Sequence, residues 1–174
     1  GQLEIAGFTL YGMSEEWQVI HLKKDGSIEW SSADAFLGKG TVECAAMLHE
    51  KFGSKVSLAI CGPVGEYGGL ISGISMSDTD QRPSRIAARG GVGAVMGSKK
   101  IKAIVIDLHK MPGFADRKKL LKGIKEYGRM IREDDATMAL KDYGTAMMGD
   151  YTNYVGGLPT NNFSAGSQAT GEGD

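Results

Sequence analysis

The segment from Arg82 to Ile106 constrains the chain most, because it combines clustered positive charge with repeated glycine. It contains no acidic residue, although the whole chain has a formal net charge of −1. Glycine lets backbone N–H groups approach an anion closely, and arginine adds forked, charge-assisted hydrogen bonds. The segment therefore predicts a site for a phosphate-bearing cofactor. Its cations are Arg82, Arg85, Arg89, Lys99, Lys100 and Lys102.

Two familiar phosphate-binding motifs do not fit this segment. Gly91, Gly93 and Gly97 have the spacing G-x-G-x-x-x-G, but the dinucleotide fingerprint directly follows a strand. Residues 84–89 contain no β-branched run, so the sequence predicts no strand there. The order Gly97-Ser98-Lys99 reverses that of a Walker loop. The alternative interpretation is a glycine-rich helix packed on a sheet with its lysines in solvent, because charge runs usually mark solvated faces.

Composition narrows the class of protein. The 174 residues match one domain of ordinary size. The 26 glycines, with only four prolines, indicate tight turns and close backbone approaches rather than collagen or disorder. The nearly balanced charge argues against a general nucleic-acid binder, and no aromatic residue lies between Tyr67 and Phe114 to stack on bases.

Neither a membrane span nor a metal site is predicted. The sequence has no apolar run of about 18 residues and no visible leader, so we expect a cytoplasmic protein. Cys44 and Cys61 form neither a C-x-x-C pair nor a zinc ribbon. We expect two reduced, buried thiols. His21, His49 and His109 share no ligand spacing.

The first part of the chain mixes strands and helices. Two apolar runs flank the turn signal Asp25-Gly26 and predict a hairpin. A helix is expected to begin with Thr41 as its N-cap and to end at Gly53. The apolar run Ile101–Ile106 predicts a strand buried on both faces. The other predicted elements are strands at Lys55–Ile60 and Leu70–Met76 and a helix at Gly91–Ser98.

The pattern changes after Met111-Pro112-Gly113, where only helices are predicted. Asp116 can cap a helix whose apolar residues recur with helical spacing through residue 131. We therefore assign residues 1–112 to one domain and residues 113–174 to the beginning of a helical domain with a disordered or incomplete tail. The predicted fold class is α+β: a mixed β-sheet with packed helices, followed by an all-helical segment.

Several stretches resemble the tungsten-containing aldehyde ferredoxin oxidoreductases. Residues 85–104, RIAARGGVGAVMGSKKIKAI, are closely similar to the signature of that family. Residues 60–66, ICGPVGE, resemble its "IGPAGEN" loop. Further likeness lies at residues 30–40, at Tyr143-Gly144-Thr145 and at Leu158-Pro159-Thr160, so that the resemblance covers nearly the whole chain.

The resemblance implies a part of a cofactor-binding base. In the family two related sheets carry a tungsten (or molybdenum) bis-pterin, and helical domains close over it. Residues 1–112 would be the second half of that base. By the motif match, Arg85 and Arg89 would contact pterin phosphates through their side chains, and Ile86 and Ala88 through their backbone. The family commonly has glycine where this chain has Ala88.

The resemblance also implies an activity for a longer parent protein. That protein would oxidise an aldehyde to a carboxylic acid and pass electrons through a [4Fe–4S] cluster to ferredoxin. The cluster-binding cysteine run and the acid/base glutamate and histidine of the family do not occur in the 174 residues, so we expect the isolated chain to be inactive. A non-catalytic module that binds a phosphate or nucleotide remains the alternative, and the sequence leaves a homo-oligomer open.

Overall fold

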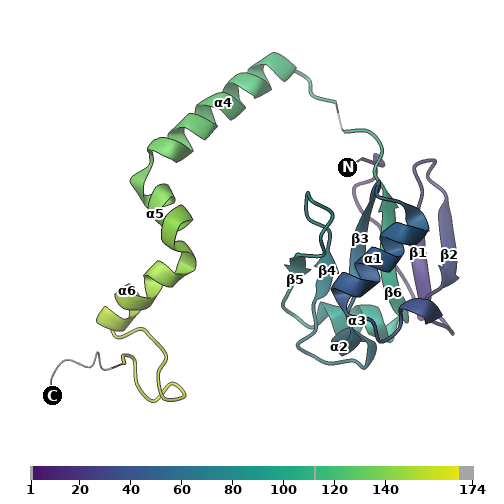
Figure 1. Ribbon diagram of the computed structural model, residues 1–174, viewed down its shortest axis with the longest axis horizontal. Helices are drawn as coiled ribbons and strands as arrows, with labels where there is room; N and C mark the ends of the chain where they lie inside the picture. The colour runs from purple at the N-terminus through teal and green to yellow at the C-terminus, as the bar shows by residue number, and fades with distance from the viewer. Residues whose placement is uncertain (1, 112, 169–174) are drawn as a thin grey trace. The chain divides into compact units, whose positions relative to one another are not determined.

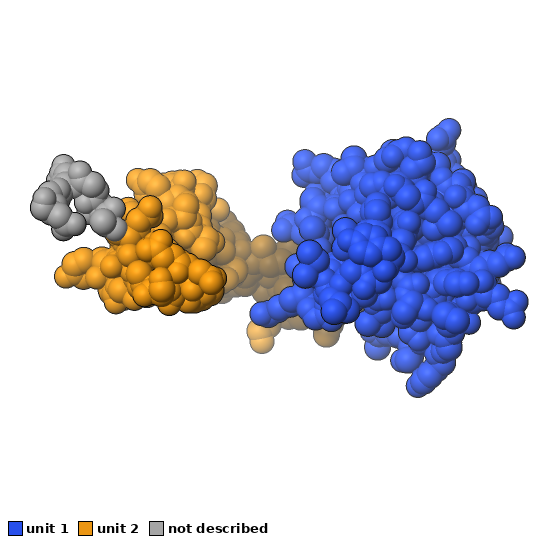
Figure 2. Space-filling model, turned by 90° about the horizontal axis from the view of Figure 1, so that it is seen from below, with its two compact units in different colours: residues 1–113 blue, residues 114–174 orange. Residues whose placement is uncertain are grey.

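The computed structural model describes residues 2–111 and 113–168. The chain divides into two compact units, residues 1–113 and residues 114–174, coloured separately in Figure 2. The first unit contains a six-stranded mixed sheet with helices, and the second is helical (Figure 1). The predicted fold class is thus confirmed. In the described residues no helix combines the length and the apolar character needed to cross a membrane.

The sheet of the first unit has the strand order β2-β1-β6-β3-β4-β5. Its central strand β6 pairs parallel with β1 and antiparallel with β3. The predicted hairpin is present as β1 and β2, which pair antiparallel from Gln18↔Ser32 to Leu22↔Ile28. The strands are β1 (Gln18–Leu22), β2 (Ile28–Ser32), β3 (Val56–Cys61), β4 (Ile74–Met76), β5 (Arg85–Ala87) and β6 (Ile101–Asp107).

One face of the sheet is covered by helix α1 (Thr41–Phe52) (Figure 1). Its apolar residues Cys44, Ala45 and Leu48 pack with a row of strand residues into the larger core cluster. Gly53 ends the helix with a φ of 86° that favours glycine. The N-cap is Gly40 and not Thr41, and no side chain caps this end. The strand residues in the cluster are Val19, Val56, Leu58, Ile60, Ala103 and Val105.

The opposite face carries a second, smaller core cluster. Helix α3 (Val92–Ser98) contributes Met96 to it, beside Ile20 and Cys61. Leu3 and Leu10 of the N-terminal segment pack against the same cluster. With Ala103 in one cluster and Ile101 in the other, β6 is buried on both faces, as its apolar run predicts.

Two strand predictions need correction. The strand predicted at Leu70–Met76 is limited to Ile74–Met76, because residues 69–72 form a turn closed by a hydrogen bond from the Ser72 N–H to the Gly69 carbonyl. Residues 84–89, where no strand was predicted, contain β5. This strand exists because it pairs with β4, from Ile74↔Ala87 to Met76↔Arg85. A tertiary partner thus overrides a weak local propensity.

The second unit begins with α4 (Arg117–Glu133), which Asp116 caps by accepting a hydrogen bond from the Lys119 N–H at 2.8 Å. Its apolar stripe, including Ile124 and Tyr127, is exposed within this unit. Such a helix draws most of its stability from burial against a partner surface. The following elements are α5 (Asp135–Tyr143), a 3₁₀ turn (Gly144–Met147) and α6 (Met148–Tyr154). Part of the predicted tail, residues 169–174, lies outside the described residues.

Candidate cofactor-binding site

A groove of about 320 Å³ lies where β3 ends and the chain turns into the short helix α2 (Pro63–Glu66). Pro63 takes the first helical position, where a missing N–H leaves no intrahelical hydrogen bond unmade. The groove has no charged side chain in its lining; glycine, hydroxyl and aliphatic groups form its walls. The lining residues are Thr41, Gly62, Pro63, Val64, Gly65, Ile71, Ser72, Gly73, Ser75 and Ile86.

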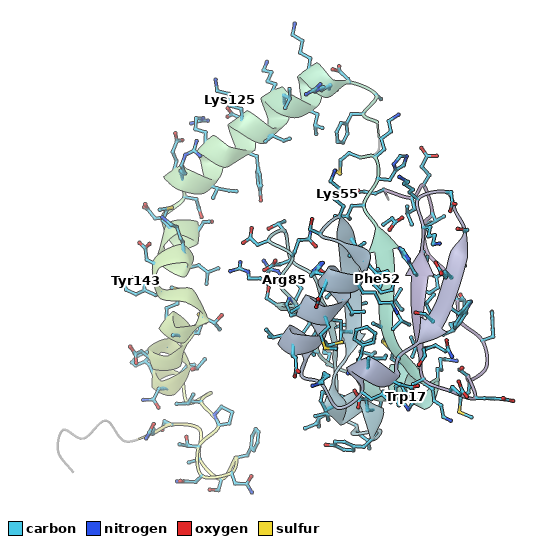
Figure 3. All side chains as sticks on the ribbon, turned by 45° about the vertical axis from the view of Figure 1, so that its right-hand side comes forward. Trp17, Phe52, Lys55, Arg85, Lys125 and Tyr143 are labelled. Carbon is cyan, nitrogen blue, oxygen red and sulfur yellow. The ribbon has the colours of Figure 1, made fainter. Side chains whose placement is uncertain are left out.

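Strand β5 forms the edge of the sheet beside this groove and carries two of the predicted site residues. Successive side chains of a strand point to opposite faces, and the structure separates Arg85 from Ile86 accordingly. Ile86 lines the groove. Arg85 lines a different hollow of about 470 Å³ together with Ser77 and Asp78, and it lies at the edge of the sheet (Figure 3). Among the described residues, β5 has a strand partner on one side only, so its outer backbone edge is open to a ligand.

Ala88 and Arg89 follow β5 in an exposed bend. Ala88 is absent from the residues with positive φ, so its Cβ meets no left-handed strain and its N–H can approach a ligand. Gly90 and Gly91 do adopt left-handed angles, with φ of 84° and 67°. The space beside Gly90 is open, because a Cβ there would meet no atom within 4 Å. The bend therefore exposes the backbone of the residue that follows Arg89.

The six cations of the segment divide into engaged and unengaged groups. Arg82 pairs with Asp78 at 3.1 Å and with Asp80 at 2.6 Å. Lys99 and Lys100 donate to backbone carbonyls of the N-terminal segment at 3.0 and 2.6 Å.

Lys102, the fourth engaged cation, is fully buried. The side chains of Arg85 and Arg89 are exposed and have no ion pair or hydrogen-bond partner among the described residues. The predicted six-cation anion site is thus reduced to two available guanidinium groups.

The glycines of helix α3 serve packing rather than ligand approach. A Cβ on Gly97 would overlap the carbonyl oxygen of Gly65 in α2. A Cβ on Gly93 would lie 2.5 Å from the carbonyl oxygen of Gly73. These glycines bring α2, α3 and the segment before β4 into backbone contact. Their contact partners Gly65 and Gly73 line the groove, so this packing supports the groove wall. The helix-packing interpretation therefore applies to Gly93 and Gly97, while the space beside Gly90 remains accessible to a ligand.

The cysteines are free and buried, as predicted. Cys61 lies directly before the groove, and its thiol donates weakly to the Gly93 carbonyl at 3.5 Å. Burial raises the pKa of Cys61 to about 11, and burial likewise raises the pKa of Cys44. Both thiols are therefore protonated near neutral pH and poorly nucleophilic. The described residues contain no group of three or more metal-ligating side chains.

Comparison with known proteins identifies the family of the chain. The sequence model for the N-terminal domain of aldehyde ferredoxin oxidoreductase matches residues 2–108. This is more than half of the chain. The chain belongs to the aldehyde ferredoxin oxidoreductase family.

Curated relatives within the family carry the name tungsten-containing aldehyde ferredoxin oxidoreductase. The Pyrococcus horikoshii protein is 39% identical over 144 residues, which cover 82% of this chain and 23% of the relative. The Pyrococcus furiosus protein is 35% identical over 170 residues, which cover 95% of this chain and 27% of the relative. The chain thus spans about a quarter of the length of these relatives.

A solved structure shares the fold. The active-site complex BamBC of benzoyl coenzyme A reductase, determined with 1,5-dienoyl-CoA, matches with a TM-score of 0.62 and 27% identity. The match covers 71% of this chain and 18% of that chain. The mixed sheet with its packed helices therefore occurs in an oxidoreductase whose name differs from that of the curated relatives.

For a member of the aldehyde ferredoxin oxidoreductase family, the sequence indicated four candidate cofactor-contacting residues but not the ion pair beneath the groove. Arg85, Ile86, Ala88 and Arg89 lie together on β5 and in the following bend. The interaction of Glu66 with Lys102 was not predicted. One signal was available: a lysine inside a run expected to be buried on both faces must itself be buried, and a buried ammonium needs acceptors.

Proposed function

We propose that residues 1–112 form part of the base that holds a bis-pterin tungsten or molybdenum cofactor, and that residues 113–174 begin a helical domain. The observation that carries this proposal is the pair of exposed, unpaired guanidinium groups of Arg85 and Arg89 within the family signature. Two forked cationic donors beside open backbone fit the anionic phosphates of such a cofactor.

Each of the four signature residues has a proposed role. Arg85 and Arg89 would bind phosphate through their side chains, with charge-assisted hydrogen bonds. Ile86 and Ala88 would contribute backbone groups from the open edge of β5 and from the bend after it. The uncharged groove beside Ile86 would exclude water from the bound group without competing for the phosphates.

For the longer protein we propose the oxidation of an aldehyde to a carboxylic acid. The reaction takes RCHO and water to RCOOH with the release of two protons and two electrons. The bound metal–pterin group supplies the redox chemistry, and this chain supplies binding and charge neutralisation. The electrons would leave one at a time through a [4Fe–4S] cluster, with ligands outside this chain, to ferredoxin. The name of the curated relatives supports aldehyde and ferredoxin as reactants.

The test is Arg89→Ala in the protein at its full natural length. Removal of one charge-assisted contact with a phosphate costs roughly 1.5–3 kcal/mol, which lowers affinity about 10- to 150-fold. We expect less pterin and less metal per protein after purification, measured by fluorescence of the oxidised pterin and by elemental analysis.

The control is Lys55→Ala. It also removes one exposed cation, but at the start of β3, opposite the end where the groove lies (Figure 3). It should leave both contents unchanged. Equal cofactor content in the Arg89 variant and the wild-type protein would refute the phosphate-binding role.

A further inference from the structure

Lys102 of strand β6 is a fully buried cation whose every donor is used. Its side chain is 0% exposed, and its ammonium donates to the Cys61 carbonyl at 2.8 Å and to the Lys39 carbonyl at 3.3 Å. A third hydrogen bond goes to the Glu66 carboxylate. An ammonium has three N–H donors, so Lys102 has none left for a ligand.

Glu66 extends the same network. One carboxylate oxygen accepts from Lys102, and the other accepts from the Gly38 N–H at 2.9 Å. The side chain is only 15% exposed. The network therefore joins three segments that are distant in sequence: the loop before α1, the end of β3 and helix α2.

These attachment points bracket the groove. Gly62, Pro63, Val64 and Gly65 line the groove, and the residues on either side of them, Cys61 and Glu66, both bind Lys102.

The Lys102 ammonium also binds the Lys39 carbonyl. Two residues further along, Thr41 forms part of the groove wall at the start of α1. The Lys102 ammonium thus fixes both ends of the turn from Cys61 to Glu66, which forms one wall of the groove. It also holds the segment that leads into α1, which forms the other wall.

A gain in folding stability alone does not explain why the chain buries the Lys102–Glu66 ion pair. Transfer of an ammonium and a carboxylate from water into a protein interior is costly, and well-packed apolar replacements of buried ion pairs are often neutral or stabilising. What apolar side chains cannot do is donate to the Cys61 and Lys39 carbonyls or accept from the Gly38 N–H. The hydrogen bonds fix the relative positions of the three segments.

We propose that Lys102 and Glu66 are positioning residues that hold the walls of the groove in the geometry the cofactor requires. This inference rests on the proposed function. Lys102 acts through the backbone of Cys61, Lys39 and the turn between Cys61 and Glu66, and it does not touch a phosphate itself.

The test is the charge-neutral double variant Lys102→Met/Glu66→Leu in the full-length protein. Because no unpaired buried charge remains, its urea midpoint should stay close to that of the wild type. Amide hydrogen exchange in residues 37–41 and 62–67 should accelerate about tenfold, since local opening loses hydrogen bonds to charged groups. Pterin and metal contents should fall several-fold. Wild-type exchange in these peptides, or wild-type cofactor content, would overturn the proposal.

Two further variants sharpen the test. Glu66→Gln keeps an acceptor for Lys102 but replaces the oxygen that accepts from Gly38 by a donor. It also leaves the buried ammonium without a counter-charge and should lower the urea midpoint, so the reading is the difference between segments: exchange should accelerate more at residues 37–41 than at residues 62–67. Equal exchange in the two segments contradicts the proposal even if the double variant fails to fold. The control Lys100→Met removes a neighbouring lysine that binds the Glu15 carbonyl outside the groove. It should alter neither the hydrogen exchange nor the cofactor content.

The proposed function and the positioning role can fail separately. A wild-type protein that purifies without pterin under conditions that load other pterin enzymes defeats the proposed function, whereas the exchange data still decide whether Lys102 and Glu66 hold the groove walls.

Discussion

The contact between Gly97 of α3 and Gly65 of α2 allows a quantitative test of how the groove is supported. In Gly97→Ala the new Cβ would overlap the Gly65 carbonyl oxygen and lie 2.7 Å from its carbonyl carbon. These are backbone atoms and cannot rotate away, so α2 and α3 must separate. Such overpacking costs about 3 kcal/mol, and the higher helix propensity of alanine returns about 1 kcal/mol. A net loss of about 2 kcal/mol is expected.

Urea unfolding followed by tryptophan fluorescence measures this loss of stability in the first unit, residues 1–113. In the 174-residue chain both tryptophans, Trp17 and Trp30, lie in residues 1–113, so their emission reports on the sheet and not on the helical unit. With a slope of about 2 kcal/mol per molar urea, the midpoint should fall by about 1 M.

Two controls separate packing from helix propensity. Ala94→Gly lowers the helix propensity of the same short helix α3 without adding an atom, and it should cost about 1 kcal/mol. Gly123→Ala in α4 meets no atom within 4 Å and should leave the tryptophan transition unchanged. If Gly97→Ala unfolds at the wild-type midpoint, α2 and α3 are not held in backbone contact and the argument for the groove fails.

Two other predictions concern titration in the first unit. Hydrogen bonds from Ser84, and then from the Arg82 N–H, lower the pKa of Asp78 to about 2, from an ordinary value of 3.8. A lowered carboxyl pKa stabilises the fold above the unfolded value and loses that contribution as pH falls from about 4 to 2. The urea midpoint should therefore drop over this range in the wild type and less in Asp78→Asn; equal acid sensitivity in the two proteins contradicts the assignment. Because burial holds Cys61 and Cys44 as thiols, a thiol reagent at pH 8 should modify them slowly in the folded protein and rapidly in denaturant, as measured by mass spectrometry. Fast modification of the folded chain would contradict the burial of these two thiols.

Local patterns in the sequence were sufficient for most elements of the fold. The Asp25-Gly26 turn between two apolar runs predicts the β1–β2 hairpin, and Gly53 marks the end of α1. Asp116 caps α4 as expected. In each case the determining interaction lies within a few residues along the chain, so the sequence alone contains the information.

Tertiary structure decided the features that make the site. Strand β5 exists only because β4 offers it a pairing partner, and its alternation then sends Arg85 and Ile86 to opposite faces. Lys102 was grouped with phosphate-binding cations, but the fold buries it beside Glu66, which lies 36 residues earlier in the sequence.

Charge and glycine spacing along the chain could mark the segment that holds the candidate site, because both are properties of the sequence itself. Which guanidinium groups remain free, and which glycines touch backbone, depends on segments brought together from distant parts of the chain. The guanidinium groups of Arg85 and Arg89 have no partner among the described residues, while Gly97 contacts Gly65 across 32 positions. Such long-range contacts have no local pattern, so the three-dimensional packing alone determines them.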